Sequence, residues 1–216
     1  MSHLRLQAVL TTFGRNLRDA ERLAAAAQQW ASVSFPRGIP RFSVKHQHTV
    51  TQLSFFQIFL SWEFFLEETF TLYLWGKRPP SGIPPRRLVR PSTRKEAILM
   101  VVGADRNYVD WTKVDGLNSR AKKYFDDGKP YTDAFYGQRQ FFEELRVIRN
   151  AIAHSSHHSQ EEFKKLARRK LLGTFPPGMT VGGFLSTAIP GSSPPQSFLE
   201  YYVDGIIFVA EKIVPV

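Results

Sequence analysis

The residue types best suited to chemistry lie in the segment Arg146–His154, which reads RVIRNAIAH. On a helix with about 100° per residue, Arg146, Arg149, Asn150 and His154 fall within one arc of about 140°. Small alanines separate Asn150 from His154, so the polar groups should be accessible. The opposite side of this helix is an apolar stripe, which consists of Phe141, Leu145, Ile148 and Ile152.

This set of side chains suits the cleavage of a phosphodiester without metal. A histidine can take a proton from a ribose 2′-hydroxyl and return one to a leaving oxygen. An arginine stabilises the negative charge that develops on the phosphorus, and an asparagine can orient either group. The alternative interpretation is a solvated polar face, with His154 placed favourably at the negative end of the helix dipole.

The segment Arg149–His154 resembles the Arg-x4-6-His signature of HEPN-domain proteins, in which a polar residue such as Asn150 follows the arginine. Ser61–Phe65, which reads SWEFF, is similar to the aromatic-plus-acid pattern of some bacterial HEPN families. The resemblance covers residues 46–172. It does not extend to the proline-rich segment, the short helices expected within 93–125 or the part after residue 172.

The resemblance implies a metal-independent endoribonuclease that pairs as a homodimer and uses no cofactor. Arg149, His154 and Asn150 would be catalytic, with Glu63 and Arg146 in support. Products would be a 2′,3′-cyclic phosphate and a 5′-hydroxyl. It further implies a toxin or defence effector with RNA as substrate and a cognate antitoxin or regulator as a possible partner. The alternative is a catalytically inactive scaffold of the same type that binds RNA or protein.

The charge of the chain favours a polyanionic partner. Its 216 residues carry a formal net charge of +10 and no cysteine, which excludes disulfides, thiolate metal sites and a cysteine nucleophile. Residues 77–123 alone carry 12 basic and 4 acidic side chains, a net charge of +8. Prolines should hold the first part of this segment in an extended, mobile loop, either a phosphate-binding arm or a solvated surface loop. The candidate RNA-binding residues are Arg86, Arg87, Arg90, Lys164 and Lys165.

Other motifs leave further interpretations open. His154, His157 and His158 have spacings that allow metal ligation, although no metal is expected. Glu63, Glu67 and Glu68 form a carboxylate face, which we expect to pair with arginines such as Arg149. Five aromatic residues near the basic segment can stack on bases but are expected in the core: Tyr108, Trp111, Tyr124, Tyr131 and Tyr136. No glycine-rich phosphate loop or nucleophile elbow occurs.

Hydrophobic periodicity predicts an all-α fold, an antiparallel helical bundle built on two long helices with a C-terminal helical extension. The two long helices are expected at 49–75 and 133–154. The helix at 49–75 is apolar nearly all round, which is typical of a helix central to a bundle or buried between subunits. The other helices are expected at 4–33, 92–103 (capped by Ser92), 116–125, 160–172 and 198–213. A weak strand candidate covers 180–187.

The expected organisation is one HEPN-like helical domain over 1–172, with a basic proline-rich insertion at about 77–92. Residues 173–216 form a Gly/Pro-rich loop and a C-terminal helix that packs on the same domain. The longest uncharged helical stretch, 49–62, is too short to span a membrane. The start of the chain lacks the pattern of a secretory signal. A cytoplasmic protein without membrane partners is therefore expected.

Overall fold

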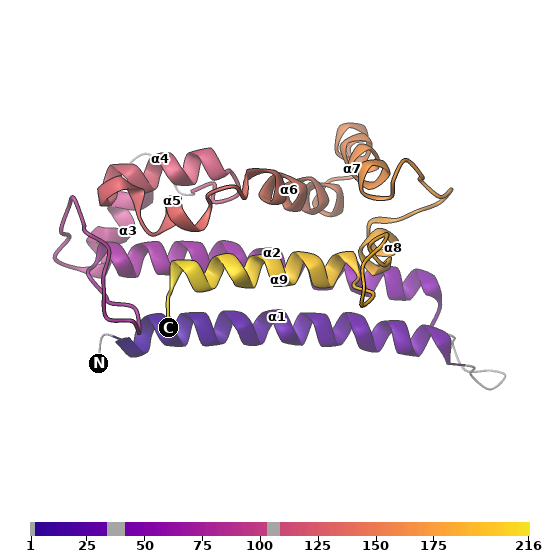
Figure 1. The fold of residues 1–216 in the computed structure, drawn as a ribbon, viewed down its shortest axis with the longest axis horizontal. Helices are drawn as coiled ribbons and strands as arrows, with labels where there is room; N and C mark the ends of the chain where they lie inside the picture. Colours follow the sequence, from indigo (N-terminus) through magenta and orange to yellow (C-terminus); the bar gives the residue numbers. More distant parts are fainter. Residues whose placement is uncertain (1–2, 34–41, 103–108) are drawn as a thin grey trace. The chain divides into compact units, whose positions relative to one another are not determined.

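The computed structural model describes residues 3–33, 42–102 and 109–216, and in these ranges the chain forms helices and no β-strand. The fold is all-α, as predicted (Figure 1). No described helix combines the length and the apolar content that crossing a bilayer requires. The α-helices are α1 His3–Ser32, α2 Val44–Leu74, α3 Arg94–Val102, α4 Val114–Tyr124, α5 Tyr131–Ala134, α6 Arg139–Ala153, α7 His157–Lys170, α8 Val181–Ser186 and α9 Phe198–Ile213, with a 3-10 turn η1 at Asp126–Gly128.

The chain divides into two compact units, neither of which is continuous in sequence. Unit 1 contains Met1–Arg15, Ser61–Glu143 and Ile206–Val216, and unit 2 contains Asn16–Leu60 and Glu144–Gly205. Helices α1, α2 and α9 each contribute residues to both units, and so does α6. The residues after 172 are therefore shared between the two units and do not form a separate part.

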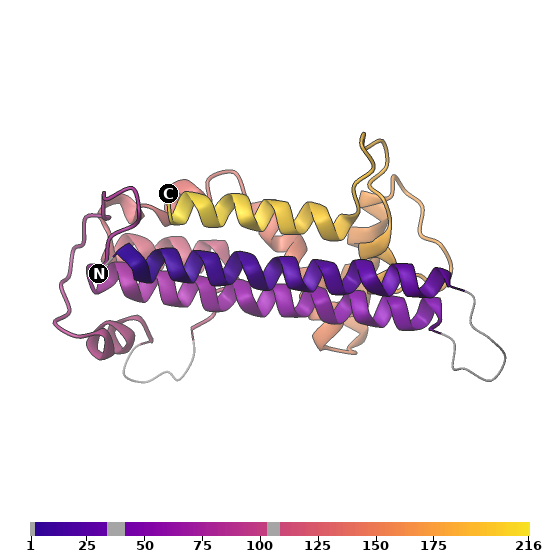
Figure 2. The ribbon, with the colours of Figure 1, turned by 90° about the horizontal axis from the view of Figure 1, so that it is seen from below.

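Unit 1 has an aromatic core around the second part of α2. The ring of Phe65 stacks on Phe13 of α1, with centroids 4.6 Å apart, and on Trp62, at 5.6 Å. Trp62 also stacks on Phe142 of α6, at 5.4 Å. The hydroxyl of Tyr73 donates a hydrogen bond of 2.7 Å to the carbonyl of Ile213 in α9. Figures 1 and 2 show the start of α1, the second part of α2 and the end of α9, all in unit 1, side by side.

Unit 2 contains the other parts of α1, α2, α6 and α9 together with α7 and α8. Phe55 of α2 contacts Tyr202 of α9 edge to face, with centroids 6.2 Å apart. Phe184 of α8 stacks on Phe198 at the start of α9, at 4.3 Å. Helix α8 thus packs on the start of α9 through these two rings.

The structure differs from the expected long helix at 133–154. Helix α5 ends at Ala134, and α6 begins only at Arg139. Gly137 between them has a φ of +72°, a left-handed conformation that interrupts a helix and that glycine adopts at little cost. The two longest helices in the described part of the chain are therefore α1 and α2, with 30 and 31 residues.

Two local predictions were wrong for reasons of capping. The weak strand candidate at 180–187 is the helix α8, because the side chain of Thr180 accepts a hydrogen bond from the backbone of Gly183 and so begins a helical turn. Helix α3 is capped by Thr93 and not by Ser92. The Thr93 hydroxyl accepts from the Glu96 N–H, and the Glu96 carboxylate reaches back to accept from the Ser92 N–H, one residue before the donor of a standard capping box.

Candidate functional site

The C-terminal part of α6, in unit 2, holds Arg149 and Asn150 next to each other. The Nη1 of Arg149 donates a hydrogen bond of 3.2 Å to the Oδ1 of Asn150. The guanidinium carbon lies 5.8 Å from the centroid of the Phe59 ring in α2, and that ring is buried. The Nε of Arg149 is buried and has no hydrogen-bond partner among the residues that the structure describes. The amide of Asn150 thus holds the Nη1 side of the guanidinium group, and the ring of Phe59 lies next to the guanidinium carbon.

His154 follows α6 directly, where its backbone N–H still donates to the carbonyl of Asn150, at 2.9 Å. The side chain of Gln160 on α7 donates to the carbonyls of Ala151, at 2.9 Å, and His154, at 3.4 Å. These are the carbonyls that a helix leaves without intrahelical partners at its C-terminal end. Gln160 therefore fixes the backbone that carries His154, while His154 itself is exposed.

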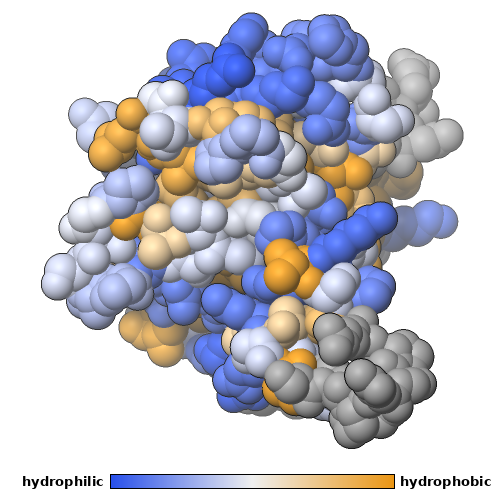
Figure 3. All heavy atoms as spheres, turned by 90° about the vertical axis from the view of Figure 1, so that its right-hand side faces the viewer, coloured by the Kyte–Doolittle hydropathy of each residue, from blue (hydrophilic) through white to orange (hydrophobic). Residues whose placement is uncertain are grey.

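Helix α7 begins where Ser156 caps it, because the Ser156 hydroxyl accepts from the Ser159 N–H. Its outer face carries two short ion pairs, Lys164 with Glu161 at 2.7 Å and Lys165 with Glu162 at 2.8 Å. Figure 3 shows hydrophilic side chains gathered over this helix, at the top of the view. Both lysine candidates for RNA binding are thus at the surface of unit 2, each next to a carboxylate.

Arg146 lies one turn before Arg149 on α6 and is half-buried. Its positive charge contributes to holding the pKa of Glu162 below the ordinary value, although the hydrogen bond from Lys165 is the main cause. Arg146 therefore belongs to the electrostatic surroundings of α7 in unit 2. It adds positive charge near the polar arc that the sequence indicates.

The remaining predicted site residues belong to unit 1, whereas Arg149 and His154 belong to unit 2. Glu63 is on the second part of α2, and Arg86, Arg87 and Arg90 are on the proline-rich segment. Glu68 belongs to the carboxylate face that we expected to pair with arginines. It pairs with Arg94 of α3, at 2.6 Å. The candidates thus comprise an α6–α7 set in unit 2 and a set in unit 1.

The proline-rich segment forms no helix, as predicted, and backbone hydrogen bonds join it to other residues of unit 1. The Leu88 N–H donates to the carbonyl of Tyr124, and the Asp126 N–H donates to the carbonyl of Arg86, both at 2.9 Å. The side chain of Arg86 pairs with Asp126 at 3.3 Å. Residues 86–88 are thus held by backbone hydrogen bonds to residues 124–126, whereas the mobility of the rest of the segment stays a prediction.

Arg87 is a structural residue of this segment. Its Nη1 donates to the carbonyl of Leu74, the last residue of α2, at 3.0 Å. The backbone of Gly76 lies directly against the guanidinium group, and a Cβ at Gly76 would be 2.7 Å from Nη1. Burial, with the nearby charge of Arg90, lowers the pKa of Arg87. Arg87 thus caps a helix end.

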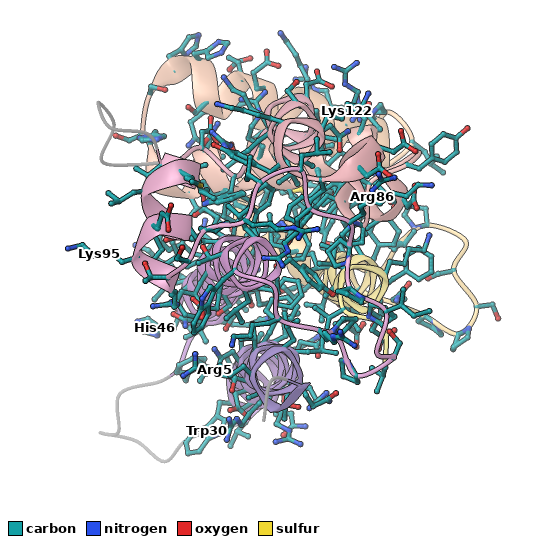
Figure 4. All side chains as sticks on the ribbon, turned by 90° about the vertical axis from the view of Figure 1, so that its left-hand side faces the viewer. Arg5, Trp30, His46, Arg86, Lys95 and Lys122 are labelled. Carbon is teal, nitrogen blue, oxygen red and sulfur yellow. The ribbon has the colours of Figure 1, made fainter. Side chains whose placement is uncertain are left out.

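Basic residues of the 77–123 segment lie on more than one side of unit 1. Figure 4 shows Arg86 and Lys122 projecting on one side of this unit and Lys95 on the other. A net charge concentrated in sequence is therefore spread in space. Three of the five aromatic residues of this region are buried, as expected, namely Trp111, Tyr124 and Tyr131, but Tyr136 is 86% exposed and Tyr108 lies outside the described residues.

A metal site was one interpretation of His154, His157 and His158. Among the residues that the structure describes, no group of three or more His, Asp or Glu side chains is placed to hold a metal ion. The backbone explains the separation of these histidines, because α6 ends before His154 and α7 starts at His157. The three residues therefore do not share one helix face.

Sequence reasoning missed a buried carboxylate in unit 2. Glu144 of α6 is only 4% exposed, and it pairs with Lys170 at 2.7 Å and with Arg169 at 3.3 Å. The oxygen that pairs with Lys170, Oε2, also accepts a hydrogen bond of 3.1 Å from the hydroxyl of Tyr202 in α9. This cluster joins α6, α7 and α9. The signal for it was the position of Glu144 at the edge of the apolar stripe of its helix.

A second group of acids, also missed, surrounds Glu21 of α1 in unit 2. Glu21 lines a cavity of about 240 Å³ and a wider one of about 680 Å³, which Glu200 also lines. Burial, then the charges of Asp204 and Glu200, raise the pKa of Glu21 to about 7, while Arg18 opposes the shift. Burial and Glu200 also raise the pKa of Asp204, although Gln196 donates to it at 2.7 Å.

Comparisons of the chain with protein-family models, with curated proteins and with solved structures find no match. The candidate site is therefore defined by the geometry of α6 and α7 in unit 2. Its members are Arg149, Asn150 and His154, with Phe59 and Gln160 as the side chains that position them.

Proposed function

We propose that this chain is an endoribonuclease that cleaves RNA through attack of a ribose 2′-hydroxyl and acts in the cytoplasm. The observation that carries the proposal is the arrangement at the end of α6. An exposed histidine follows a helix whose preceding turn holds an arginine, and the fork of that arginine is fixed by Asn150. A general base and a positioned guanidinium group are the two elements that this chemistry needs.

In the proposed reaction the imidazole of His154 takes the proton of the 2′-hydroxyl. The 2′-oxygen forms a bond to the adjacent phosphorus, and Arg149 stabilises the added negative charge on the phosphoryl oxygens. The bond from phosphorus to the 5′-oxygen then breaks, and the protonated imidazole of His154 returns a proton to that oxygen as it leaves. The products are a 2′,3′-cyclic phosphate and a 5′-hydroxyl. Asn150 positions Arg149, and no metal ion is required for any step.

RNA would be held by basic side chains outside this site. Arg86, Arg90, Lys164 and Lys165 are the candidates, since exposed ion pairs such as those of Arg86 and the lysines are weak and can be exchanged for phosphate contacts. Arg87 is less suited, because it is bonded to the carbonyl of Leu74. Glu63 and Arg146 remain supporting residues in this proposal. The role of a toxin or defence effector, with a neutralising partner, follows from the HEPN resemblance alone.

The decisive experiment is the cleavage of end-labelled RNA in an excess of chelator by the wild type, His154→Ala and Arg149→Ala. We expect each variant to lose about 100- to 10,000-fold in rate. His158→Ala, which removes another exposed histidine of the same region, is the matched control and should cut at the wild-type rate. An RNA with a 2′-deoxy sugar at the cleavage position should resist the enzyme. Equal cutting by all the proteins, or activity only with added metal, would contradict the proposal.

A second candidate function is an inactive scaffold that binds RNA or protein. The observation that favours it is the packing of Arg149, which is half-buried with its Nε enclosed and its guanidinium group against Phe59. A scaffold would bind RNA with an affinity that falls steeply with salt, and it would give no product. Anisotropy titrations at several salt concentrations, run beside the cleavage assay, separate the two functions.

A further inference from the structure

The end of α2, in unit 1, presents a tryptophan beside two positive charges. The Nζ of Lys77 lies 3.8 Å from the centroid of the Trp75 ring, and the guanidinium carbon of Arg5 in α1 lies 5.5 Å from it. All three residues belong to unit 1. Arg5 is exposed, and Trp75 and Lys77 are half-buried. The ring and both cations are therefore accessible from the solvent.

The backbone that carries Trp75 and Lys77 forms a closed turn. The Gly76 N–H donates to the carbonyl of Tyr73, and the Lys77 N–H donates to the carbonyl of Leu72, both at 2.9 Å. These two hydrogen bonds, with Gly76 at a φ of +93°, form the Schellman motif that ends many helices. The turn fixes the backbone of both residues at the end of α2, which lowers the entropy that they lose when a ligand binds.

Two arginines of the proline-rich segment add positive charge at the same turn. The guanidinium group of Arg87 lies against the backbone of Gly76 and donates to the carbonyl of Leu74, as suits a cation at the negative end of a helix dipole. The charge of Arg90 is near enough to lower the pKa of Arg87, and Arg90 itself is exposed. Arg87 is thus used by the helix end, whereas Arg90 is not. We call Arg5, Trp75, Lys77 and Arg90 the Trp75 patch.

No acidic side chain in the two segments that form the Trp75 patch balances its charge. The chain contains neither Asp nor Glu at 1–18 or at 69–95. Among the residues that the structure describes, Arg5, Lys77 and Arg90 form no ion pair, whereas Arg86 in the same segment pairs with Asp126. Unpaired cations beside an accessible aromatic ring suit a ligand that has both a π-face and negative charge. A nucleotide of a single strand combines the two.

We propose that the Trp75 patch binds a single-stranded segment of RNA, with one unpaired base stacked on the Trp75 ring. Arg5, Lys77 and Arg90 then contact the phosphates beside that base. The contact of a lysine with an aromatic ring at the surface is weaker than the stacking of a base, so the base displaces Lys77, whose ammonium group turns to a phosphate. The inference rests on the proposed function in taking RNA as the ligand, and it adds a binding site for that RNA in unit 1.

The fluorescence of Trp75 reports directly on stacking. Of the four tryptophans, Trp62 and Trp111 are only 2% and 3% exposed, so Trp30 and Trp75 are the indoles that a base can reach. In a Trp30→Phe protein, a short unstructured 2′-O-methyl RNA should quench the indole emission. This RNA has no free 2′-hydroxyl and cannot be cleaved by the proposed reaction. Adding Trp75→Phe should abolish the quenching, and the same RNA in a duplex should not quench, because its bases are already paired.

Anisotropy titrations with the same RNA, carrying a fluorescent label, measure the affinity. Trp75→Leu should raise the dissociation constant about 10-fold through the loss of stacking. Arg5→Ala and Lys77→Ala should each reduce the slope of log affinity against log salt concentration by about 0.7, because each removes one phosphate contact. Arg5 is exposed, so its variant tests the patch even where Trp75→Leu is destabilised. Lys95→Ala, at an exposed lysine that Figure 4 shows on another side of unit 1, is the matched control and should bind as the wild type does.

Three results would overturn the inference. The first is RNA binding that Trp75→Leu and Lys77→Ala leave as tight as in the wild type. The second is RNA binding that does not change the indole emission of the Trp30→Phe protein. The third is a wild type that does not bind the RNA, including one that binds vesicles of anionic phospholipid instead. Because the probe RNA is not cleaved, these results do not depend on catalysis by His154, and a failure of this binding site is distinguishable from a failure of the proposed ribonuclease.

Discussion

The guanidinium group of Arg149 is held by its neighbour Asn150, whose Oδ1 lies 3.2 Å from the arginine Nη1. Neighbouring residues on a helix point in directions about 100° apart, so this contact requires Arg149 to fold back along the helix surface. The ring of Phe59 lies beside the guanidinium group, with its centroid 5.8 Å from the guanidinium carbon. The pair of residues adjacent in sequence is thus one unit, in which Asn150 determines where the charge of Arg149 lies.

Replacement of Asn150 should therefore affect RNA cleavage more than stability. We expect Asn150→Ala to lower the single-turnover cleavage rate by about 10- to 100-fold, because a misplaced Arg149 stabilises the transition state less well. The melting temperature should change little, since Asn150 is half-exposed. Asn150→Asp keeps an oxygen that accepts from Arg149 and should retain most of the activity. A wild-type rate for Asn150→Ala would exclude this positioning role.

The buried carboxylate of Glu144 should be important for stability. Glu144→Gln removes the charge that Lys170 and Arg169 neutralise, and we expect it to lower the free energy of unfolding by about 1–3 kcal/mol. The loss is limited because the side chain of Arg169 is 59% exposed and can turn to water. Tyr202→Phe removes one hydrogen bond and should cost about 1 kcal/mol. Urea unfolding measures both.

Glu211→Gln is the matched control for this cluster, because Glu211 is an exposed acid of α9. It should leave the urea midpoint within experimental error of the wild type. If Glu144→Gln unfolds at the same urea concentration as Glu211→Gln, the contacts of Glu144 with α7 and α9 do not contribute to stability.

The helices and the face of α6 were predictable because both depend on local periodicity. Helix α9 begins and ends at the predicted residues, Phe198 and Ile213, and Leu145 and Ile148 of the apolar stripe are fully buried. The polar arc of Arg149, Asn150 and His154 follows from the same periodicity. A helical repeat is a property of neighbouring residues, so a single sequence contains it.

Contacts between distant residues were not predictable in this way. Nothing near Gln160 indicates that its side chain reaches the carbonyl of Ala151, and nothing near Arg87 indicates that it bonds to Leu74. The break at Gly137 depends on a left-handed φ, which glycine permits without requiring. The spread of the basic residues over unit 1 likewise depends on the path of the chain and not on its composition.

Gly182 allows α8 to lie directly on the backbone of α2. A Cβ at this position would be 1.9 Å from the carbonyl oxygen of His48, which is fixed within a helix. We expect Gly182→Ala to destabilise the protein by about 3 kcal/mol, because backbone on both sides must move. Thermal unfolding followed by circular dichroism measures the loss.

Gly183 provides the comparison for this contact. A Cβ there would be 2.9 Å from Cε1 of the His48 ring, and that ring can rotate away at the loss of its hydrogen bond to Thr180. Gly183→Ala should therefore cost about 1 kcal/mol. Equal losses for the two variants would show that helix propensity, and not the approach of α8 to α2, determines the effect.

The acids around Glu21 should make stability depend on pH. The pKa of Glu21 is about 7 in the folded protein, compared with its ordinary value of 4.5. The folded state therefore binds more protons than the unfolded state between these values, and stability is lost as the pH rises from about 4.5 through 7. The groups that face Glu21 are Asp204 and Glu200 of α9, which disfavour its charge, and Arg18 of its own helix, which favours it.

Glu21→Gln should remove this loss. We expect the variant to be more stable than the wild type by about 1 kcal/mol at pH 8, a value reduced for the partial exposure of Glu21, and equal to it at pH 4.5. Urea midpoints are compared between the two proteins at each pH, because a second group also makes stability depend on pH. Burial lowers the pKa of His48, so the free energy of unfolding rises with pH up to about 6.5 in both proteins. Glu211→Gln should follow the wild type throughout. A wild type and a Glu21→Gln variant that differ equally at pH 4.5 and pH 8 would show that the ionisation of Glu21 is not linked to folding.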